Sequence, residues 1–355
     1  MSTDSAPAVP PATGPLAGIR VLDCSSFIAG SFASMLLGDL GADVIKIEAP
    51  IGDLARYWAP FLNGEPLMFQ GWNRNKRGLG LDLNVPAALE IIDALVRSAD
   101  ILVENFRPGV TEKLGIHYER LRSINPRLIY CSSTAFGNKG PDRFRPGYDP
   151  VFQTIGGVAR FNTVYAGKPS LTAVAVSDFQ ASMLIVTGAT SALYHRERTG
   201  HGQLVETSLL QGVMSIQSHF FVEPLDTAPQ GVVGIFPYHL FETADSPFFL
   251  GAPTDKFWQL ACEVLGLQEL AADPRYRTNT DRVQHQAELS QILTERLKTK
   301  PAGEWEQLLA PLGIPCGALG THQDLFHAPQ TAAMEMNPVI HHATAGRLRV
   351  AGVPL

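Results

Sequence analysis

The stretch that decides the fold is residues 19–48, which read IRVLDCSSFIAGSFASMLLGDLGADVIKIE. Its first five residues form a short apolar run that is typical of a buried parallel strand. Small residues follow, and apolar side chains then recur at helical spacing from Phe32 to Leu40. Gly41 is suited to the position after a helix, and residues 42–48 predict a second strand. This strand, helix, strand order predicts an α/β fold in which helices cover a parallel sheet.

The turn between the first strand and the helix lacks the glycine patterns that hold nucleotide phosphates. Dinucleotide-binding turns carry GxGxxG and phosphate loops carry GxxxxGK[ST], and neither pattern occurs at this turn. Residues 38–41, GDLG, lie at the far end of the helix, where they cannot cradle a pyrophosphate. We therefore expect no nicotinamide or flavin cofactor and no P-loop chemistry.

Further buried strands extend the predicted sheet, with an amphipathic helix at residues 85–98 between the first two. These strands are expected within residues 73–83, 100–106, 128–132 and 203–208. Ligands of open parallel sheets bind at the carboxyl ends of the strands. Phe27, Asn105, Phe106 and the loop 132–140 all follow such ends, so this edge is the expected binding site.

The composition is that of an ordinary soluble globular protein. Hydrophobic residues make up 45% and charged residues 17% of the 355 positions, and the net charge of −6 gives no reason to expect a nucleic-acid partner. No apolar run reaches the roughly 18 residues that a membrane helix needs. The four cysteines show no CxxC spacing, which indicates free thiols in a reducing, cytoplasmic compartment. No histidine pair has a carboxylate at metal-ligand spacing, so no metal site is expected.

The chain is long enough for two domains. Residues 1–15, rich in Pro and Ala, predict a disordered tail and not a signal peptide. Residues 16–222 are expected to form a large Rossmann-like domain, and residues 223–234 a linker with Pro, Gly and no periodicity. Strand and helix patterns in residues 235–328 predict a smaller α+β domain. Residues 329–355 are then expected to return to the large domain as a shortened segment.

A single carboxylate, Asp178, stands out in the stretch 145–188. The apolar run 171–176 before it predicts a buried strand, and the small residues 181–186 after it predict a helix. An aspartate at such a junction can simply cap the helix by accepting backbone N–H groups. Considered without the remaining sequence, Asp178 fits either a structural cap or a reactive carboxylate.

Several motifs occur in order along nearly the whole chain after residue 15. They include SSFIAGSFASMLLGDLGADVIKIEAP from residue 25, NRNKRGLGLDLN from residue 73, ADILVENFRPGV from residue 99, GYD at residues 147–149, SDFQASM from residue 177 and RTGHGQLVETSLL from residue 198. Together they resemble the class III CoA-transferase family, which groups formyl-CoA and carnitine CoA-transferases with α-methylacyl-CoA racemases. The resemblance implies coenzyme A or acyl-CoA as substrate, an inserted smaller domain, and two chains interlocked in a homodimer.

The resemblance also implies roles for single residues. Asp178 matches the catalytic aspartate of the family. The positions that match its CoA pocket are Phe27, Ile28 and Ala29 in the first turn, Leu81, Asn105 and Phe106 near the adenine and pantetheine, Lys113 near the nucleotide, and Tyr148 beside the thioester. Ala49 and Pro50 replace a cation of relatives, so Arg56 or Arg74 is expected to supply that phosphate contact. Gly231 and Gly234 are the counterparts of the glycine-rich loop that covers the intermediate in formyl-CoA transferase.

A carboxylate nucleophile suits the exchange of CoA between two acids. Asp178 attacking an acyl-CoA would give a mixed anhydride and CoA thiolate, and the thiolate would then attack the aspartyl carbonyl to give an enzyme thioester. An incoming acid reverses the steps, provided that water is excluded. The sequence does not identify the acids, although Arg56, Arg145 and Arg160 are candidates to hold a second carboxylate.

Two other functions stay open at this point. An α-methylacyl-CoA racemase pairs the same aspartate with a histidine, but the partner position here is Tyr148, whose high pKa makes it a poor base. A non-catalytic CoA-binding protein would keep the fold without turnover. For the cations Lys76, Arg77 and Lys113, a solvated surface position is the alternative to a functional one.

Overall fold

The structure is a computed structural model that describes residues 13–226 and 234–354. Its contacts group the chain into two units, one formed by residues 1–222 with 334–355 and the other by residues 223–333. Most of the predicted tail and most of the predicted linker, including Gly231, lie outside the described residues. The domain boundaries drawn from the sequence stay predictions.

Unit 1 is built on a six-stranded parallel sheet in the order β5-β2-β1-β6-β7-β8. The strands are β1 (Arg20–Asp23), β2 (Asp43–Glu48), β5 (Lys76–Gly80), β6 (Ile101–Glu104), β7 (Ile129–Thr134) and β8 (Leu204–Ser208). In chain order this is 3-2-1-4-5-6, the strand order of Rossmann folds, in which the order reverses between the first and fourth strands. The predicted α/β fold with a central parallel sheet is confirmed.

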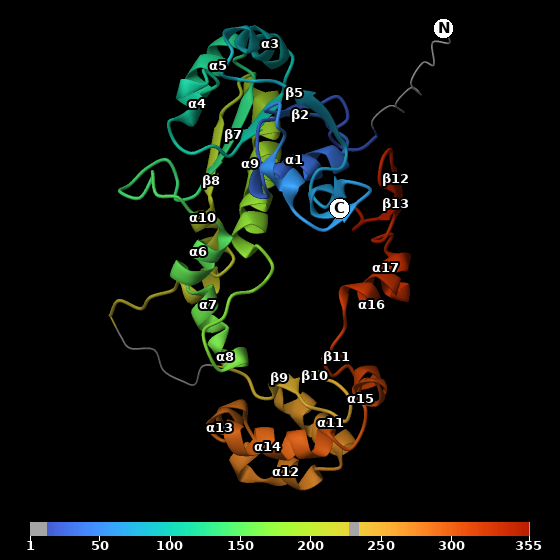
Figure 1. Ribbon diagram of the computed structural model, residues 1–355. Helices are drawn as coiled ribbons and strands as arrows, with labels where there is room; N and C mark the ends of the chain where they lie inside the picture. The colour runs from blue at the N-terminus through green and yellow to red at the C-terminus, as the bar shows by residue number, and fades with distance from the viewer. Residues whose placement is uncertain (1–12, 227–233, 355) are drawn as a thin grey trace. The chain divides into compact units, whose positions relative to one another are not determined.

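Helices cover both faces of the sheet (Figure 1). On one face α1 (Ala29–Asp39) and α9 (Val176–Thr199) pack on strand residues such as Val21 and Ile101. On the other face α3 (Pro86–Val96) and α5 (Tyr118–Ile124) pack on residues such as Leu22 and Leu102. Because both faces are buried at the centre of the sheet, the central strands β1 and β6 are largely apolar in sequence, whereas the edge strands β5 and β8 are more exposed and more polar.

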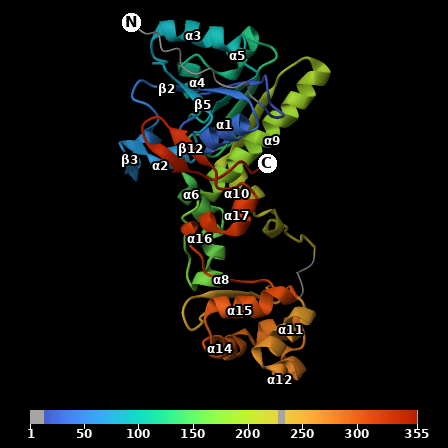
Figure 2. The ribbon, with the colours of Figure 1, turned by 90° about the vertical axis from the view of Figure 1, so that its right-hand side faces the viewer.

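Shorter elements complete unit 1. They are β3 (Phe61–Leu62), β4 (Glu65–Pro66), α2 (Leu67–Gln70), α4 (Val110–Lys113), α6 (Asp149–Ile155), α7 (Val158–Phe161), α8 (Thr163–Ala166), α10 (Leu209–Ser215), β12 (Val339–His342) and β13 (Gly346–Arg349). The β12–β13 hairpin lies beside α1 and α2 (Figure 2). The Arg74 guanidinium donates to the carbonyl oxygens of Ala351 at 2.8 Å and Gly352 at 3.3 Å, which ties the C-terminal segment to unit 1.

The strand predicted at residues 171–176 is wrong. This segment is irregular over residues 171–175 and Val176 already begins α9, and the side chains of Leu171 and Val174 are 52% and 58% exposed. Its backbone groups are satisfied by a side chain instead of a neighbouring strand, since Gln153 accepts from Thr172 N at 2.8 Å and donates to Thr172 O at 3.1 Å. Apolar composition alone therefore misled the prediction.

Unit 2 has its own hydrophobic core, in which Trp258 and Trp305 are fully buried. A three-stranded antiparallel sheet packs against helices there. The elements are β9 (Tyr238–Phe241), β10 (Phe248–Gly251), β11 (Cys316–Ala318), α11 (Asp255–Leu265), α12 (Gln268–Ala272), α13 (Asn279–Gln284), α14 (Gln286–Leu297), α15 (Ala302–Leu309), α16 (His322–His327) and α17 (Pro329–Ala333).

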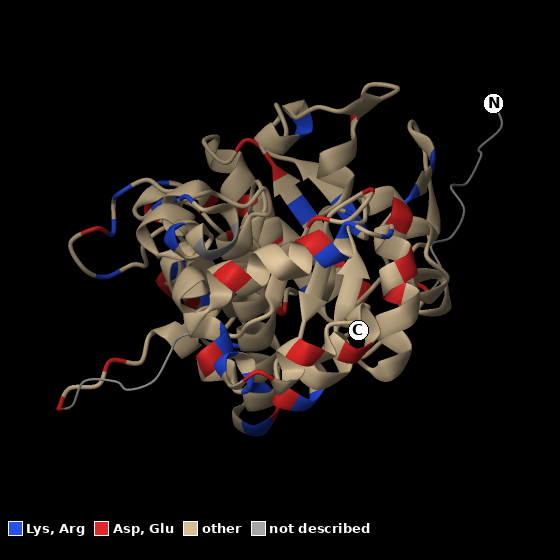
Figure 3. Ribbon diagram, turned by 90° about the horizontal axis from the view of Figure 1, so that it is seen from below, with Lys and Arg blue, Asp and Glu red and all other residues tan. Residues whose placement is uncertain are grey.

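Acidic and basic residues are scattered over the helices, strands and loops of the described chain (Figure 3). Within the described ranges, no helix combines the length and the apolar character needed to cross a lipid bilayer. All four cysteines are free, and three of them are buried.

Candidate active site

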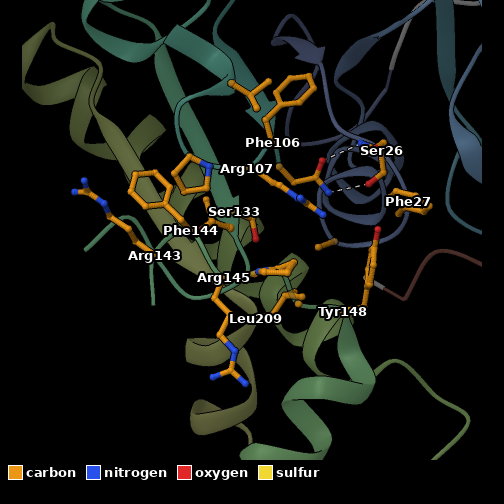
Figure 4. A pocket seen from close by; sticks show the side chains of 18 of the residues that line it. Ser26, Phe27, Phe106, Arg107, Ser133, Arg143, Phe144, Arg145, Tyr148 and Leu209 are labelled. Atoms are coloured by element: carbon orange, nitrogen blue, oxygen red, sulfur yellow. Dashed lines mark hydrogen bonds between the residues drawn. The ribbon is translucent and has the colours of Figure 1, made fainter. Parts of the chain in front are cut away.

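A pocket of about 280 Å³ opens at the carboxyl ends of β1 and β6, where the strand order of the sheet reverses. This is where Rossmann-like sheets bind ligands, because the connections from the two strands diverge to opposite faces and leave a crevice. Asp178 lies in the wall of this pocket. The other lining residues that matter below are Ser26, Phe27, Ala29, Asn105, Phe106, Arg107, Ser133, Arg143, Arg145 and Tyr148 (Figure 4).

Asp178 lies in the first turn of α9 and is half-buried. The cap position of this helix is Ala175, so the interpretation of Asp178 as the N-cap is wrong. The backbone N–H of Ala29, at the start of α1, lies near the Asp178 carboxyl and lowers its pKa. Ser182 Oγ fixes this approach, since it lies 2.6 Å from Ala29 O and 2.8 Å from Asp178 O. The carboxyl is thus held at the N-terminal ends of two helices, where negative charge is favoured.

Burial and the neighbouring charge of Asp149 raise the pKa of Asp178 to about 7. Asp149 is itself buried and held in place, because its Oδ1 accepts from Ser177 N at 2.8 Å and from Ser177 Oγ at 2.7 Å. Its other oxygen accepts from Gln153 Nε2 at 2.5 Å. A second carboxylate is therefore fixed near the first, and at neutral pH Asp178 lies close to its own titration point.

The side chains of Asn105 and Asp53 hold the turn between β1 and α1. Ser26 N donates to Asn105 Oδ1 at 2.9 Å, and Asn105 Nδ2 donates back to Ser26 O at 2.7 Å, as the dashed lines in Figure 4 show. Phe27 has a positive φ of 60°, a conformation that costs energy for a residue with a side chain. Its N–H donates to both oxygens of Asp53 at 3.2 Å. The turn keeps this shape because surrounding side chains bind its backbone.

Two lysines lie in the interior behind this turn. Lys46 on β2 and Lys76 on β5 have side chains only 2% and 3% exposed, and both pair with Asp23 at the end of β1. Burial lowers the pKa of Lys76 to about 8, although the Asp23 carboxylate opposes that change. The expectation that Lys76 is a solvated surface cation is wrong, whereas Arg77 is 63% exposed.

The sequence profile of CoA-transferase family III matches residues 16–355. The chain belongs to this family. Acetyl-CoA:oxalate CoA-transferase from Acetobacter aceti is 36% identical over 342 residues, covering 94% of this chain and 87% of the relative. Succinyl-CoA:glutarate CoA-transferase from Mus musculus is 34% identical over 350 residues, covering 95% and 79%. The crystal structure of a CAIB/BAIF family protein from Brucella suis superimposes with a TM-score of 0.82 at 34% identity, covering 96% of this chain and 92% of that one.

The fold brings most of the predicted site residues of this CoA-transferase to one place. Phe27, Ala29, Asn105, Phe106 and Tyr148 line the same pocket as Asp178. The ring centroids of Phe27 and Tyr148 are 5.9 Å apart, and the two side chains face each other at the rim of the pocket (Figure 4).

The remaining predicted contacts lie elsewhere. Leu81 lines an adjoining cavity that shares Phe106 with the first pocket. Ile28 packs against the core beneath α1. Lys113 is exposed on α4 and is not among the described residues that line either cavity, although the adjacent Leu114 lines the second. Whether Lys113 contacts CoA stays a prediction. Arg56 and Arg74 are each paired with a carboxylate, Glu48 at 2.7 Å and Asp39 at 2.5 Å, so the charge of each is already balanced within the protein.

The sequence analysis missed several polar groups of the pocket. Ser133 Oγ is buried in its wall without a hydrogen-bond partner in the described part of the chain, so it is available to a ligand. Arg107 and Arg143 also line the pocket, together with Arg145, which the sequence did suggest. The position of Ser133 at the carboxyl end of β7 was the signal that could have identified it.

Proposed function

We propose that this CoA-transferase moves CoA between carboxylic acids through covalent intermediates on Asp178. The observation that carries the proposal is the Asp178 carboxyl in the wall of the pocket, beside the start of α1 and with a pKa near neutrality. The named relatives act on oxalate and glutarate, which supports a dicarboxylic acid as one substrate.

The proposed reaction begins when the Asp178 carboxylate attacks the thioester carbonyl of the donor acyl-CoA. The carbon–sulfur bond breaks, the acyl group is left on Asp178 as a mixed anhydride, and CoA leaves as a thiolate. The thiolate then attacks the aspartyl carbonyl carbon and expels the donor acid, which leaves CoA on the enzyme as a thioester. The acceptor carboxylate attacks this thioester, which forms a new mixed anhydride on Asp178 and releases CoA thiolate. The thiolate then attacks the carbonyl carbon of the acceptor, which releases the new acyl-CoA and the free Asp178 carboxylate.

The Ala29 N–H is suited to assist each attack on the aspartyl carbonyl. It lies beside the Asp178 carboxyl, the group on which negative charge develops when sulfur or oxygen adds to the carbonyl carbon. A fixed backbone donor at that atom stabilises the tetrahedral state without rearranging. The first step needs the ionised carboxylate, so we expect the rate of covalent labelling to rise with pH through about 7.

A dicarboxylic acid would need a cation for its non-reacting carboxylate. Arg107, Arg143 and Arg145 all line the pocket. In Figure 4 the guanidinium groups of Arg143 and Arg145 extend away from Ser26 and Phe27, while Arg107 lies between Phe106 and Ser133. We therefore propose that Arg107 holds the second carboxylate, because a guanidinium binds a carboxylate through two parallel hydrogen bonds.

The family also supports a larger assembly. We propose that residues 223–333 form an inserted small domain, since the chain leaves unit 1 after residue 222 and returns to it at residue 334. We propose further that two chains interlock in a homodimer, as the resemblance to the family implies. Analytical ultracentrifugation of the full chain tests the dimer, and a sedimenting monomer at micromolar concentration would contradict it.

The test of the chemistry is mass spectrometry of the protein mixed with succinyl-CoA or acetyl-CoA, quenched and trapped with hydroxylamine. We expect a modification on the peptide that carries Asp178, absent from Asp178→Asn and present in Asp142→Asn, whose carboxyl is exposed in a nearby loop. An unmodified peptide with every donor would contradict covalent transfer. Deuterium exchange at the acyl α-carbon would then indicate a racemase, and CoA binding without either reaction would indicate a non-catalytic binding protein.

A further inference from the structure

The turn that lines the pocket, Ser25–Ala29, has its first three backbone N–H groups bound by three different side chains. Ser25 N donates to Asp23 Oδ1 at 2.9 Å, Ser26 N to Asn105 Oδ1 at 2.9 Å, and Phe27 N to Asp53 at 3.2 Å. The same turn carries the Ala29 N–H, which lies near the Asp178 carboxyl. The direction of that N–H therefore depends on how firmly the preceding residues are held.

Lys46 connects these anchors from behind. Its ammonium group donates to Ser25 O at 2.8 Å and Ser31 Oγ at 3.1 Å, and it pairs with Asp53 Oδ2 at 3.2 Å. It thus contacts the turn itself, the first turn of α1 and the carboxylate that binds Phe27 N. Among the residues that the structure describes, Lys46 is the cation that forms an ion pair with Asp53.

The contacts of Lys46 are made in the interior. The Lys46 and Asp53 side chains are 2% and 1% exposed. A buried carboxylate that loses its cation is strongly destabilised and tends to move or become protonated. Either change would weaken its hold on Phe27 N, and the strained positive φ of Phe27 would then relax toward an ordinary value.

We propose that Lys46 is a positioning residue for the transfer reaction, which holds the Ser25–Ala29 turn in the shape that directs the Ala29 N–H at Asp178. This inference rests on the proposed function only for its effect on rate. Lys46 is not among the described residues that line the active-site pocket or the adjoining Leu81 cavity, although it lines a separate cavity beside residues 340–342, so we expect it to act on the reaction through the turn.

Lys76 provides a matched control. It is as buried as Lys46 and lies in the same cluster, where its ammonium group pairs with Asp23 at 2.9 Å and donates to Ser31 O at 2.7 Å and Asn73 Oδ1 at 2.7 Å. It makes none of the contacts to Ser25 or Asp53 that Lys46 makes. Lys76 still reaches the turn indirectly, because its partner Asp23 binds Ser25 N. A purely structural role of the cluster therefore predicts equal effects of the two lysines, whereas the positioning role predicts a larger effect on the turn from Lys46, which also holds Ser25 O and Asp53.

The experiment compares Lys46→Met and Lys76→Met in the full-length protein by hydrogen–deuterium exchange of the peptide that covers residues 24–31. Affinity for CoA by calorimetry and the rate of Asp178 labelling by acyl-CoA are measured on the same samples. For Lys46→Met we expect the rate of exchange in this peptide to rise by about tenfold or more. We expect the rate of Asp178 labelling to fall by about tenfold or more, because small displacements of a catalytic donor are costly. For Lys76→Met, which leaves the Lys46–Asp53 pair in place, we expect clearly smaller changes in both than for Lys46→Met, whatever its loss of stability.

Equal exchange in the two variants, or a protected turn in Lys46→Met, would overturn the inference. If Lys46→Met does not fold, Asp53→Asn keeps an oxygen for Phe27 N while removing the charge, and it must show the same increase in exchange. Absence of label on Asp178 in the wild-type protein would refute the proposed chemistry and not the positioning. In that case turn exchange and CoA affinity decide the inference by themselves.

Discussion

Replacing Asp178 with asparagine is expected to stabilise the folded protein while abolishing transfer. The asparagine side chain has the same shape, and its oxygen can still accept the Ala29 N–H. What it removes is the ionisable carboxyl, whose pKa is raised to about 7 by burial and by the charge of Asp149. Active sites commonly hold such groups at the expense of stability.

The magnitude follows from the linkage between ionisation and folding. The folded-state pKa of about 7 lies above the ordinary 3.8, so between these values the folded state binds more protons than the unfolded state. Stability of the wild type therefore falls as pH rises through this range. At about 1.4 kcal/mol for each pH unit, the raised pKa of Asp178 costs roughly 2 kcal/mol at pH 5, where the folded state must take up a proton, and roughly 4 kcal/mol at pH 8, where the buried carboxyl is ionised. Since Asp178 keeps some solvent contact, we expect the advantage of the variant to grow by about 1 to 3 kcal/mol between these pH values.

The assay is urea unfolding of wild type and Asp178→Asn at about pH 5, 6.5 and 8, followed by circular dichroism and tryptophan fluorescence. Glu90→Gln is the matched control, because Glu90 is exposed on α3 and its replacement should leave the pH dependence unchanged. A stability difference between Asp178→Asn and wild type that is the same at pH 5 and pH 8 would refute the reasoning. The pocket would then not disfavour the ionised carboxyl.

Three further outcomes are expected. Asp149→Asn removes a negative charge that raises the pKa of Asp178, so the pH midpoint of Asp178 labelling should fall below that of wild type; an unchanged or higher midpoint would contradict this. Asn105→Ala removes the two hydrogen bonds to Ser26, and at about 1 kcal/mol each the KM for acyl-CoA should rise roughly 5- to 30-fold, which steady-state kinetics will measure; a KM within twofold of wild type would be inconsistent. Arg282→Met should destabilise unit 2 by roughly 3 to 5 kcal/mol, because the fully buried guanidinium pairs with Asp255 and binds Phe236 O, whereas Arg275→Met at an exposed pair should change the free energy of unfolding by less than about 1 kcal/mol.

The order of strand and helix patterns in the sequence predicted the elements of the parallel sheet in unit 1 well. Residues 19–48 form the expected strand, helix and strand, and the later strands lie within a few residues of the predicted ranges. Buried parallel strands and amphipathic helices have strong local patterns, which explains this success. The run 171–176 shows the limit, because an apolar segment whose backbone is bound by Gln153 looks the same in sequence as a strand.

The site was predicted in part by the strand ends and in part by the family motifs. Asp178, Asn105 and Phe106 do meet at the reversal of strand order. Lys46 and Lys76 could not be identified as interior residues, because lysines in a sequence carry no mark of their burial. Only the convergence of β1, β2 and β5 brings them to Asp23.

The sequence by itself therefore determined the parallel sheet, the edge at which it binds ligands and the family to which the motifs belong. These properties follow from local periodicity and from the order of residues along the chain. Only the tertiary structure decided that Ala29 N–H meets Asp178, that Asp149 raises its pKa and that Lys46 holds Asp53 behind the turn. Such contacts join residues far apart in the chain, and their energies depend on burial, which exists only once the two faces of the sheet are covered.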